Sequence, residues 1–198
     1  MKIQKLLSGG LFLLTAMVTH AQPDSAHITQ RALFYADSLV KADAYQDYAA
    51  YSRLAPASVI KYYGGNEGYS GHVLQLRSLT TSIQDEAAPE LQMQTLVTAK
   101  DQWQCVIRLS RFYHRDDKKY HLVSYLIGQS KDEGETWRLF DVNYNKVDNL
   151  ILIFPDILDM PIKETSMLTE EQELAKQQAA AAASAPAGKK PGSGTRRK

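Results

Sequence analysis

Four histidines follow residue 21, and histidine is the side chain best suited to proton transfer at neutral pH. They are His27, His72, His114 and His121. None lies at the H-x-x-x-H or H-x-H spacing of a metal-binding pair, so the sequence predicts no metal site and no cofactor. His121 falls in an apolar stretch typical of a central strand. With Asp37 and Tyr35 it could act as a general base, although a histidine held by ordinary hydrogen bonds is the simpler interpretation.

Motifs of nucleophilic and nucleotide-binding enzymes do not occur in this chain. G-x-S-x-G, the P-loop and G-x-G-x-x-G are absent. Ser58, Ser70 and Ser110 have no neighbours that would activate a hydroxyl. Cys105 follows Trp103 on the most apolar strand face, which indicates a buried, unreactive thiol. The sequence therefore predicts no catalytic residue.

Aromatic side chains suggest a different chemistry, the binding of a small ligand. Seven of the eleven tyrosines precede residue 70. A tyrosine buries its ring while its hydroxyl keeps a partner or water, so such a group could line a partly wet pocket or an ordinary helix–sheet interface. The pocket candidates are Tyr35, Tyr48, Trp103, His121 and Tyr125.

Residues 130–137 match S-x-D-x-G-x-T-W at every fixed position, through Ser130, Asp132, Gly134, Thr136 and Trp137. The motif resembles the Asp-box, a turn that recurs in sialidase-type propellers. In such a turn the carboxylate accepts amide hydrogen bonds, the glycine supplies an unusual φ, and the tryptophan packs beneath the hairpin. One copy in a chain of 198 residues predicts a structural hairpin and not a sialidase.

A cluster of basic residues surrounds one expected hairpin with two aspartates at its tip. The basic members are Arg108, Arg111, Arg115, Lys118 and Lys119. A solvated turn between charged strand ends is the simpler interpretation, and an anion-binding rim is the alternative.

The N-terminal residues 1–21 resemble a secretory signal peptide. Lys2 and Lys5 precede an apolar stretch, and Ala21 ends a small-residue cleavage site. We therefore expect export to the periplasm or medium, with a retained N-terminal anchor as the rival. Hydrophobic residues make up 44% and charged residues 23% of the chain, as in a soluble globular protein, and a single cysteine excludes an internal disulfide.

Residues 169–198 form a separate segment in this interpretation, and 22–168 the folded domain. A Thr-Glu-Glu-Gln capping box predicts a solvated helix through 179–183 that ends before Pro186. The end of the chain carries five basic residues and no acid, against sixteen basic and twenty-two acidic residues in the remainder after residue 21. This tail could touch anionic envelope surfaces, and an acidic exported domain is not expected to bind nucleic acid.

Three helices are expected before residue 66. The first is indicated by an apolar stripe with helical spacing: Ile28, Ala32, Tyr35 and Leu39. Asp24 or Ser25 can cap it. The second is expected over 44–52. The third begins at Pro56 and ends at Gly64-Gly65, where a positive φ is needed.

Strands are expected over 73–81, 91–99, 103–110, 120–127 and 137–142. The stretch 120–127 is apolar on both faces, which is typical of a central strand. Strands and helices do not alternate, so the sequence predicts an α+β fold in which helices pack on an antiparallel sheet.

This order of elements, with a Pro-started helix that ends in Tyr-Tyr-Gly-Gly, resembles the NTF2-like (cystatin-like α+β) superfamily over about residues 28–144, with 149–154 as a further candidate. The resemblance implies a bent sheet that wraps the helices into a cone, a ligand pocket at its open end, and homodimers through the sheet. We accordingly expect an exported, non-enzymatic module that binds a small ligand or an envelope protein. A small pocket enzyme (hydrolase, isomerase or dehydratase) and an envelope assembly protein are the alternatives.

Overall fold

The computed structural model describes residues 24–78, 84–85, 87–99, 102–115, 117–142 and 147–184. The expected signal peptide and the basic end of the chain lie outside these ranges.

Within the described ranges the chain has the predicted α+β class, and its first helices precede the sheet. These helices are α1 (Ser25–Ala44), α2 (Tyr48–Arg53), α3 (Ala57–Tyr62) and α4 (Asn66–Ser78). The strands are β1 (Gln84–Asp85), β2 (Glu90–Ala99), β3 (Gln102–Arg115), β4 (Lys118–Ser130), β5 (Arg138–Asp141) and β6 (Ser166–Thr169). The later helical segments are η2 (Val147–Asn149), α5 (Leu150–Ile153) and α6 (Glu170–Ser184).

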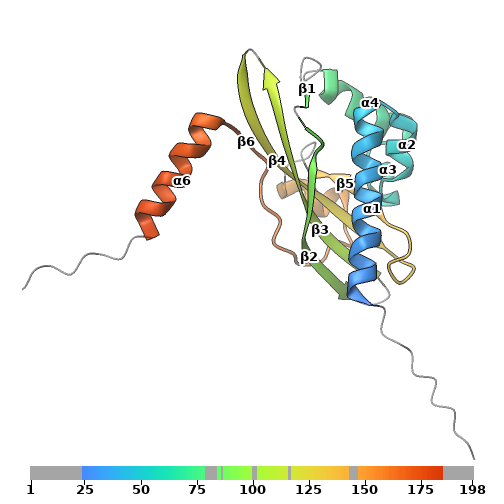
Figure 1. Cartoon of the computed structure of the whole chain (residues 1–198). Helices are drawn as coiled ribbons and strands as arrows, with labels where there is room; N and C mark the ends of the chain where they lie inside the picture. Colours follow the sequence, from blue (N-terminus) through green and yellow to red (C-terminus); the bar gives the residue numbers. More distant parts are fainter. Residues whose placement is uncertain are drawn as a thin grey trace, which may run out of the picture.

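The described strands form one antiparallel sheet in the order β1-β3-β4-β5, with β2 also on β3 and β6 also on β4. β4 is central, as predicted for 120–127, because β3 pairs along one edge and β5 and β6 along the other. Figure 1 shows α1–α4 on one side of the sheet and α6 on the opposite side. Side chains that alternate along β3 and β4 therefore face two different layers.

The helical predictions for the N-terminal part are largely confirmed. Asp24 caps α1 and accepts a hydrogen bond from the Ala26 amide at 3.0 Å. Pro56 is the cap of α3, with ψ of 145°, and not its first helical residue. Gly64 and Gly65 have φ of 81° and 108°, as expected after that helix.

The predicted strand over 73–81 is wrong in its described part, because Val73–Ser78 end helix α4. Tyr69 and Val73, four residues apart, are buried, whereas Leu74 is 50% exposed. That spacing belongs to a helical face. The alternating sequence Leu-Gln-Leu-Arg fits both periods over so short a stretch, and burial of the helical stripe decides between them.

The layer between α1–α4 and the sheet is the hydrophobic core. Its largest buried members include Ile28, Leu39, Tyr51, Tyr69, Ile107, Leu126 and Trp137. Cys105 lies there fully buried, and burial raises the pKa of its thiol to about 12. The thiol therefore stays protonated at neutral pH, as an unreactive cysteine should.

A charged group lies within this core. Asp43, at the end of α1, is 5% exposed, and its carboxylate lies 2.7 Å from Arg77 Nε and 3.2 Å from Arg111 Nη1. Arg111 was expected beside the solvated β3–β4 turn, but it faces the helices and ties β3 to α1. The small hollow at this position has a volume of about 10 Å³, enough for one water at most.

Candidate functional site

The predicted pocket residues do not share one pocket. Tyr35 and Tyr48 lie on α1 and α2, and Trp103 lies on the sheet face that meets these helices. His121 and Tyr125 lie on the opposite face, because their strand positions alternate with Leu122 and Leu126. The strand alternation was readable from the sequence, but which layer covers each face was not.

The proposed partners of His121 are also wrong. Asp37 forms an exposed ion pair with Lys41 at 2.6 Å, on the helical side of the sheet. His121 Nδ1 instead lies 2.9 Å from Glu173 Oε1, and its Nε2 lies 2.7 Å from Ser110 Oγ. Ser110, His121 and Glu173 thus form a continuous hydrogen-bonded chain from β3 through β4 to α6.

Local sequence signals explain how Glu173 reaches this position. β6 pairs with residues 120–123 of β4, so the chain arrives at α6 beside His121. The predicted capping box then forms: the Thr169 amide donates to Gln172 Oε1 at 3.0 Å and the Gln172 amide to Thr169 Oγ1 at 3.3 Å. Glu173 follows in the first turn of the helix, where a carboxylate is also favoured by the helix dipole.

A cleft of about 300 Å³ opens between the sheet and α6, and we call it the α6 cleft. It is lined by Arg108, His121 and Val123 of the sheet, Ser166 and Leu168 of β6, and Glu173, Lys176, Gln177 and Ala180 of α6. Three of these residues can carry positive charge, and Glu173 is the acid among them.

Arg108 is the least expected member of the α6 cleft. Its side chain is half-buried, and it makes no hydrogen bond or ion pair with any other residue in the described ranges. Its position in the sequence suggests that it belongs with the charged β3–β4 turn, but it lies on the face opposite Arg111 and well along the strand from Lys118. The expected basic cluster is therefore divided between two layers.

The turn at residues 130–137 is held together by hydrogen bonds of its own side chains. Asp132 accepts hydrogen bonds from the Thr136 amide at 2.9 Å and from the hydroxyls of Thr136 and Ser130 at 2.6 and 2.8 Å. Burial opposes ionisation of Asp132, but these hydrogen bonds outweigh it and lower the pKa of the carboxyl below its ordinary value. Gly134 has φ of 93°, and Trp137 is fully buried with its indole N–H on the Gly134 carbonyl at 2.9 Å.

No protein-family model, no curated protein and no solved structure matches this chain. Among the residues that the structure describes, no group of three or more His, Cys, Asp or Glu side chains could hold a metal ion. The helices in those ranges are also too short or too polar to cross a membrane.

Proposed function

We propose that this protein is an exported, non-enzymatic module that binds a small carboxylate-bearing ligand in the α6 cleft. The observation that carries the proposal is the half-buried guanidinium of Arg108, which has no hydrogen-bond or ion-pair partner among the residues that the structure describes. Partial burial removes water from a charged group, and no described residue compensates for that loss with a hydrogen bond or an ion pair. A ligand carboxylate would do so, because the planar guanidinium donates two parallel hydrogen bonds to it.

The other lining residues define the kind of acid that would fit. Lys176 adds a cationic donor near Arg108, while Val123, Leu168 and Ala180 offer an apolar wall. The Glu173 carboxylate is hydrogen-bonded to His121, with Oε1 2.9 Å from Nδ1, so it repels an incoming anion less than a carboxylate without a partner would. A volume of about 300 Å³ is at the lower end for small-molecule sites. We therefore expect a short monocarboxylic acid with an apolar body.

The finer fold assignment belongs to the same proposal. The NTF2-like resemblance is supported by the order of elements and by helices gathered on one face of an antiparallel sheet. The buried hollow beside Asp43, between α1 and the sheet, has a volume of only about 10 Å³, so we propose that the carboxylate binds on the opposite face. Export remains an expectation from residues 1–21.

The proposal is tested by titrating the mature chain, residues 22–198, with acetate, butyrate, benzoate and succinate by NMR. We expect a monocarboxylate to shift resonances of residues around the α6 cleft. Arg108→Gln should weaken its binding about tenfold or more, the effect of losing one charge-assisted hydrogen bond. Lys118→Gln, an exposed residue at the β3–β4 turn with the same change of charge, is the control. No binding by any acid, or equal binding by both variants, contradicts the proposal.

A second candidate function is ester hydrolysis, and the favouring observation is the Ser110–His121–Glu173 chain. Its distances of 2.7 and 2.9 Å suit a nucleophile, a base and an orienting acid. Ser110 Oγ would add to the ester carbonyl as His121 Nε2 takes the hydroxyl proton, which then passes to the departing alkoxide. Water would attack the acyl group in the same way and restore the serine.

Access is the reason for ranking hydrolysis second. Ser110 is 4% exposed and lies within the ladder, opposite Glu90 on one side and Val123 on the other. We expect that a fluorophosphonate probe does not label the folded protein. Stoichiometric labelling at Ser110, located by mass spectrometry and lost in Ser110→Ala, would instead favour the hydrolase.

A further inference from the structure

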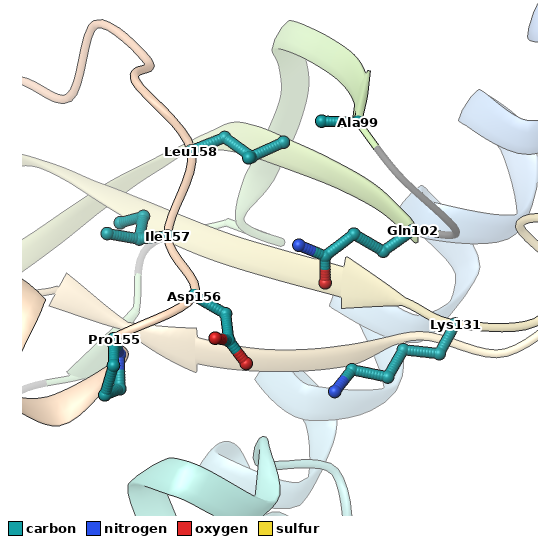
Figure 2. A pocket seen from close by; sticks show the side chains of 7 residues that line it. All are labelled: Ala99, Gln102, Lys131, Pro155, Asp156, Ile157 and Leu158. Carbon is teal, nitrogen blue, oxygen red and sulfur yellow. The ribbon is translucent and has the colours of Figure 1, made fainter.

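A second groove lies at the end of the sheet where β4 passes into the 130–137 turn. A hollow of about 620 Å³ is lined by α2 and α3 on one side and by the turn on the other. A second hollow of about 510 Å³ is lined by Ala99, Gln102, Lys131 and residues 155–158 (Figure 2). Lys131 lines both hollows, and a 2.5 Å hydrogen bond joins Gln129 of the first to Gln102 of the second. We call the two together the Lys131 groove.

Positive charge gathers in the larger hollow. Arg53, Lys131 and Arg138 all line it, and none of them forms an ion pair with a carboxylate of the described residues. Arg138 donates a hydrogen bond to the Arg53 carbonyl, which places the two side chains on neighbouring segments of the same wall. This gathering is notable in a chain whose acidic residues outnumber its basic ones outside the tail.

The acid in the larger hollow is Asp132, and its oxygens are already occupied. Thr136 and Ser130 donate three hydrogen bonds to its carboxylate, so its lone pairs point into the turn. Three cations and one anion leave a net charge of about +2. That value complements a phosphate monoester, which carries about −1.5 to −2 at neutral pH.

The smaller hollow offers room for the rest of such a ligand. Figure 2 shows the side chains of Gln102, Lys131 and Asp156 directed toward the space between them, whereas the side chain of Ile157 points away from it. Gln102 and Asp156 can accept hydrogen bonds from hydroxyl groups. A phosphate in the larger hollow would thus have its polar, hydroxyl-bearing body beside it.

Both walls of the Lys131 groove are held in place without a ligand. The fully buried Gln104 donates from Nε2 to the Asp156 carbonyl at 2.7 Å and accepts the Leu158 amide at 2.9 Å. The 130–137 turn is fixed by the hydrogen bonds to Asp132. A groove that is already ordered loses little conformational entropy when a ligand binds.

We infer that the Lys131 groove is a binding site for a phosphorylated small molecule with a hydroxyl-bearing body, such as a sugar phosphate. It is separate from the α6 cleft in its residues and in the chemistry of its ligand.

Calorimetric titration of the mature chain at low salt tests this inference. The probes are inorganic phosphate, glucose 6-phosphate and glucose. We expect glucose 6-phosphate to bind, inorganic phosphate to bind more weakly, and glucose not to bind. If inorganic phosphate binds as tightly as glucose 6-phosphate, the inference that the groove also binds the sugar is overturned. If neither inorganic phosphate nor glucose 6-phosphate binds, the whole inference is overturned.

Variants locate the binding in the groove. Lys131→Gln and Arg53→Gln remove exposed side chains, so both proteins should fold, which equal melting temperatures would verify. Each should weaken glucose 6-phosphate binding about tenfold, as loss of one charge near a dianion predicts. Lys163→Gln makes the same change of net charge at an exposed position outside the groove and should leave the affinity within about twofold. An equal loss in Lys163→Gln would mean that net charge alone attracts the anion. Arg108→Gln should retain phosphate binding, so failure of the carboxylate site and failure of this site are distinguishable.

Discussion

The buried ion pairs of Asp43 allow a sharp test of how burial governs electrostatic energy in this fold. We consider Asp43→Ala in the chain of residues 22–198. The substitution removes a carboxylate that is 5% exposed and contacts Arg77 and Arg111, whose side chains are 21% and 10% exposed. Two guanidinium groups would then remain in the core without this carboxylate.

Breaking a buried ion pair by removal of one partner costs about 3–5 kcal/mol, because the remaining charge stays desolvated. Asp141 lines the same small hollow and offsets part of the positive charge, so we expect a loss of unfolding free energy at the low end of this range, about 3 kcal/mol. For a chain of this size that corresponds to a fall in Tm of about 9 °C. The free energy of unfolding would be measured by urea denaturation, with an unchanged m-value showing that the denatured state is the same.

Asp37→Ala is a matched control on the same helix. Asp37 lies 2.6 Å from Lys41, closer than either arginine lies to Asp43, but both side chains are exposed. Water and salt screen that pair, so its removal should leave the unfolding midpoint unchanged within error. Equal losses in the two variants, or a loss below about 1 kcal/mol for Asp43→Ala, would refute the argument that burial sets the energy.

Three further predictions concern the turn at 130–137, the same turn in acid, and helix α6. Gly134→Ala should destabilise the protein by about 2 kcal/mol, because φ is 93° and the new Cβ would lie 2.8 Å from Ile28 Cγ1. Gly71→Ala on α4 is the control and should not destabilise it, because a Cβ there meets nothing within 4 Å; chemical denaturation of both variants measures the difference. Folding lowers the pKa of Asp132, so the contribution of its carboxylate to stability is complete above the unfolded pKa and is lost as pH falls through the folded pKa. The difference in unfolding free energy between wild type and Asp132→Asn should therefore be constant near neutral pH and shrink in acid. Truncation after Thr169 should change Tm little, because the helix that it removes is largely exposed. It should abolish carboxylate binding in the NMR titration, because it also removes Glu173 and Lys176 from the α6 cleft.

Much of the fold was predictable because periodicity reports the layers of an α+β protein well. The strands over 91–99 and 103–110 were predicted from alternation, the strand over 120–127 from its apolar residues on both faces, and helix α1 from its apolar stripe. The strand prediction for 73–78 was wrong because six residues hold three strand repeats but fewer than two helical turns, so the helical period is harder to recognise there. β6 was missed because four residues carry too little pattern to be distinguished from a loop.

The candidate site was predictable only in one residue, His121. Its partner Glu173 lies 52 positions away and is one of several acids in the first turn of α6, so no local signal distinguishes it. Arg108 looked like part of a solvated turn because sequence proximity to other basic residues suggested one cluster. The alternation of the strand separates Arg108 from Arg111, and that consequence could have been drawn from the sequence alone.

Gln104 shows where such reasoning ends. Its alternation with Trp103 and Cys105 correctly places it on the other face of β3, and a polar residue there predicts contact with water. The face is instead covered by residues 155–158, and the buried amide satisfies both a carbonyl and an N–H of that segment. A buried polar group needs such partners, and one glutamine has the donor and acceptor to supply them. The period of a strand therefore gives the side to which a residue points, while the partner on that side depends on distant segments. Both proposed ligand sites of this protein lie on surfaces that such distant segments complete.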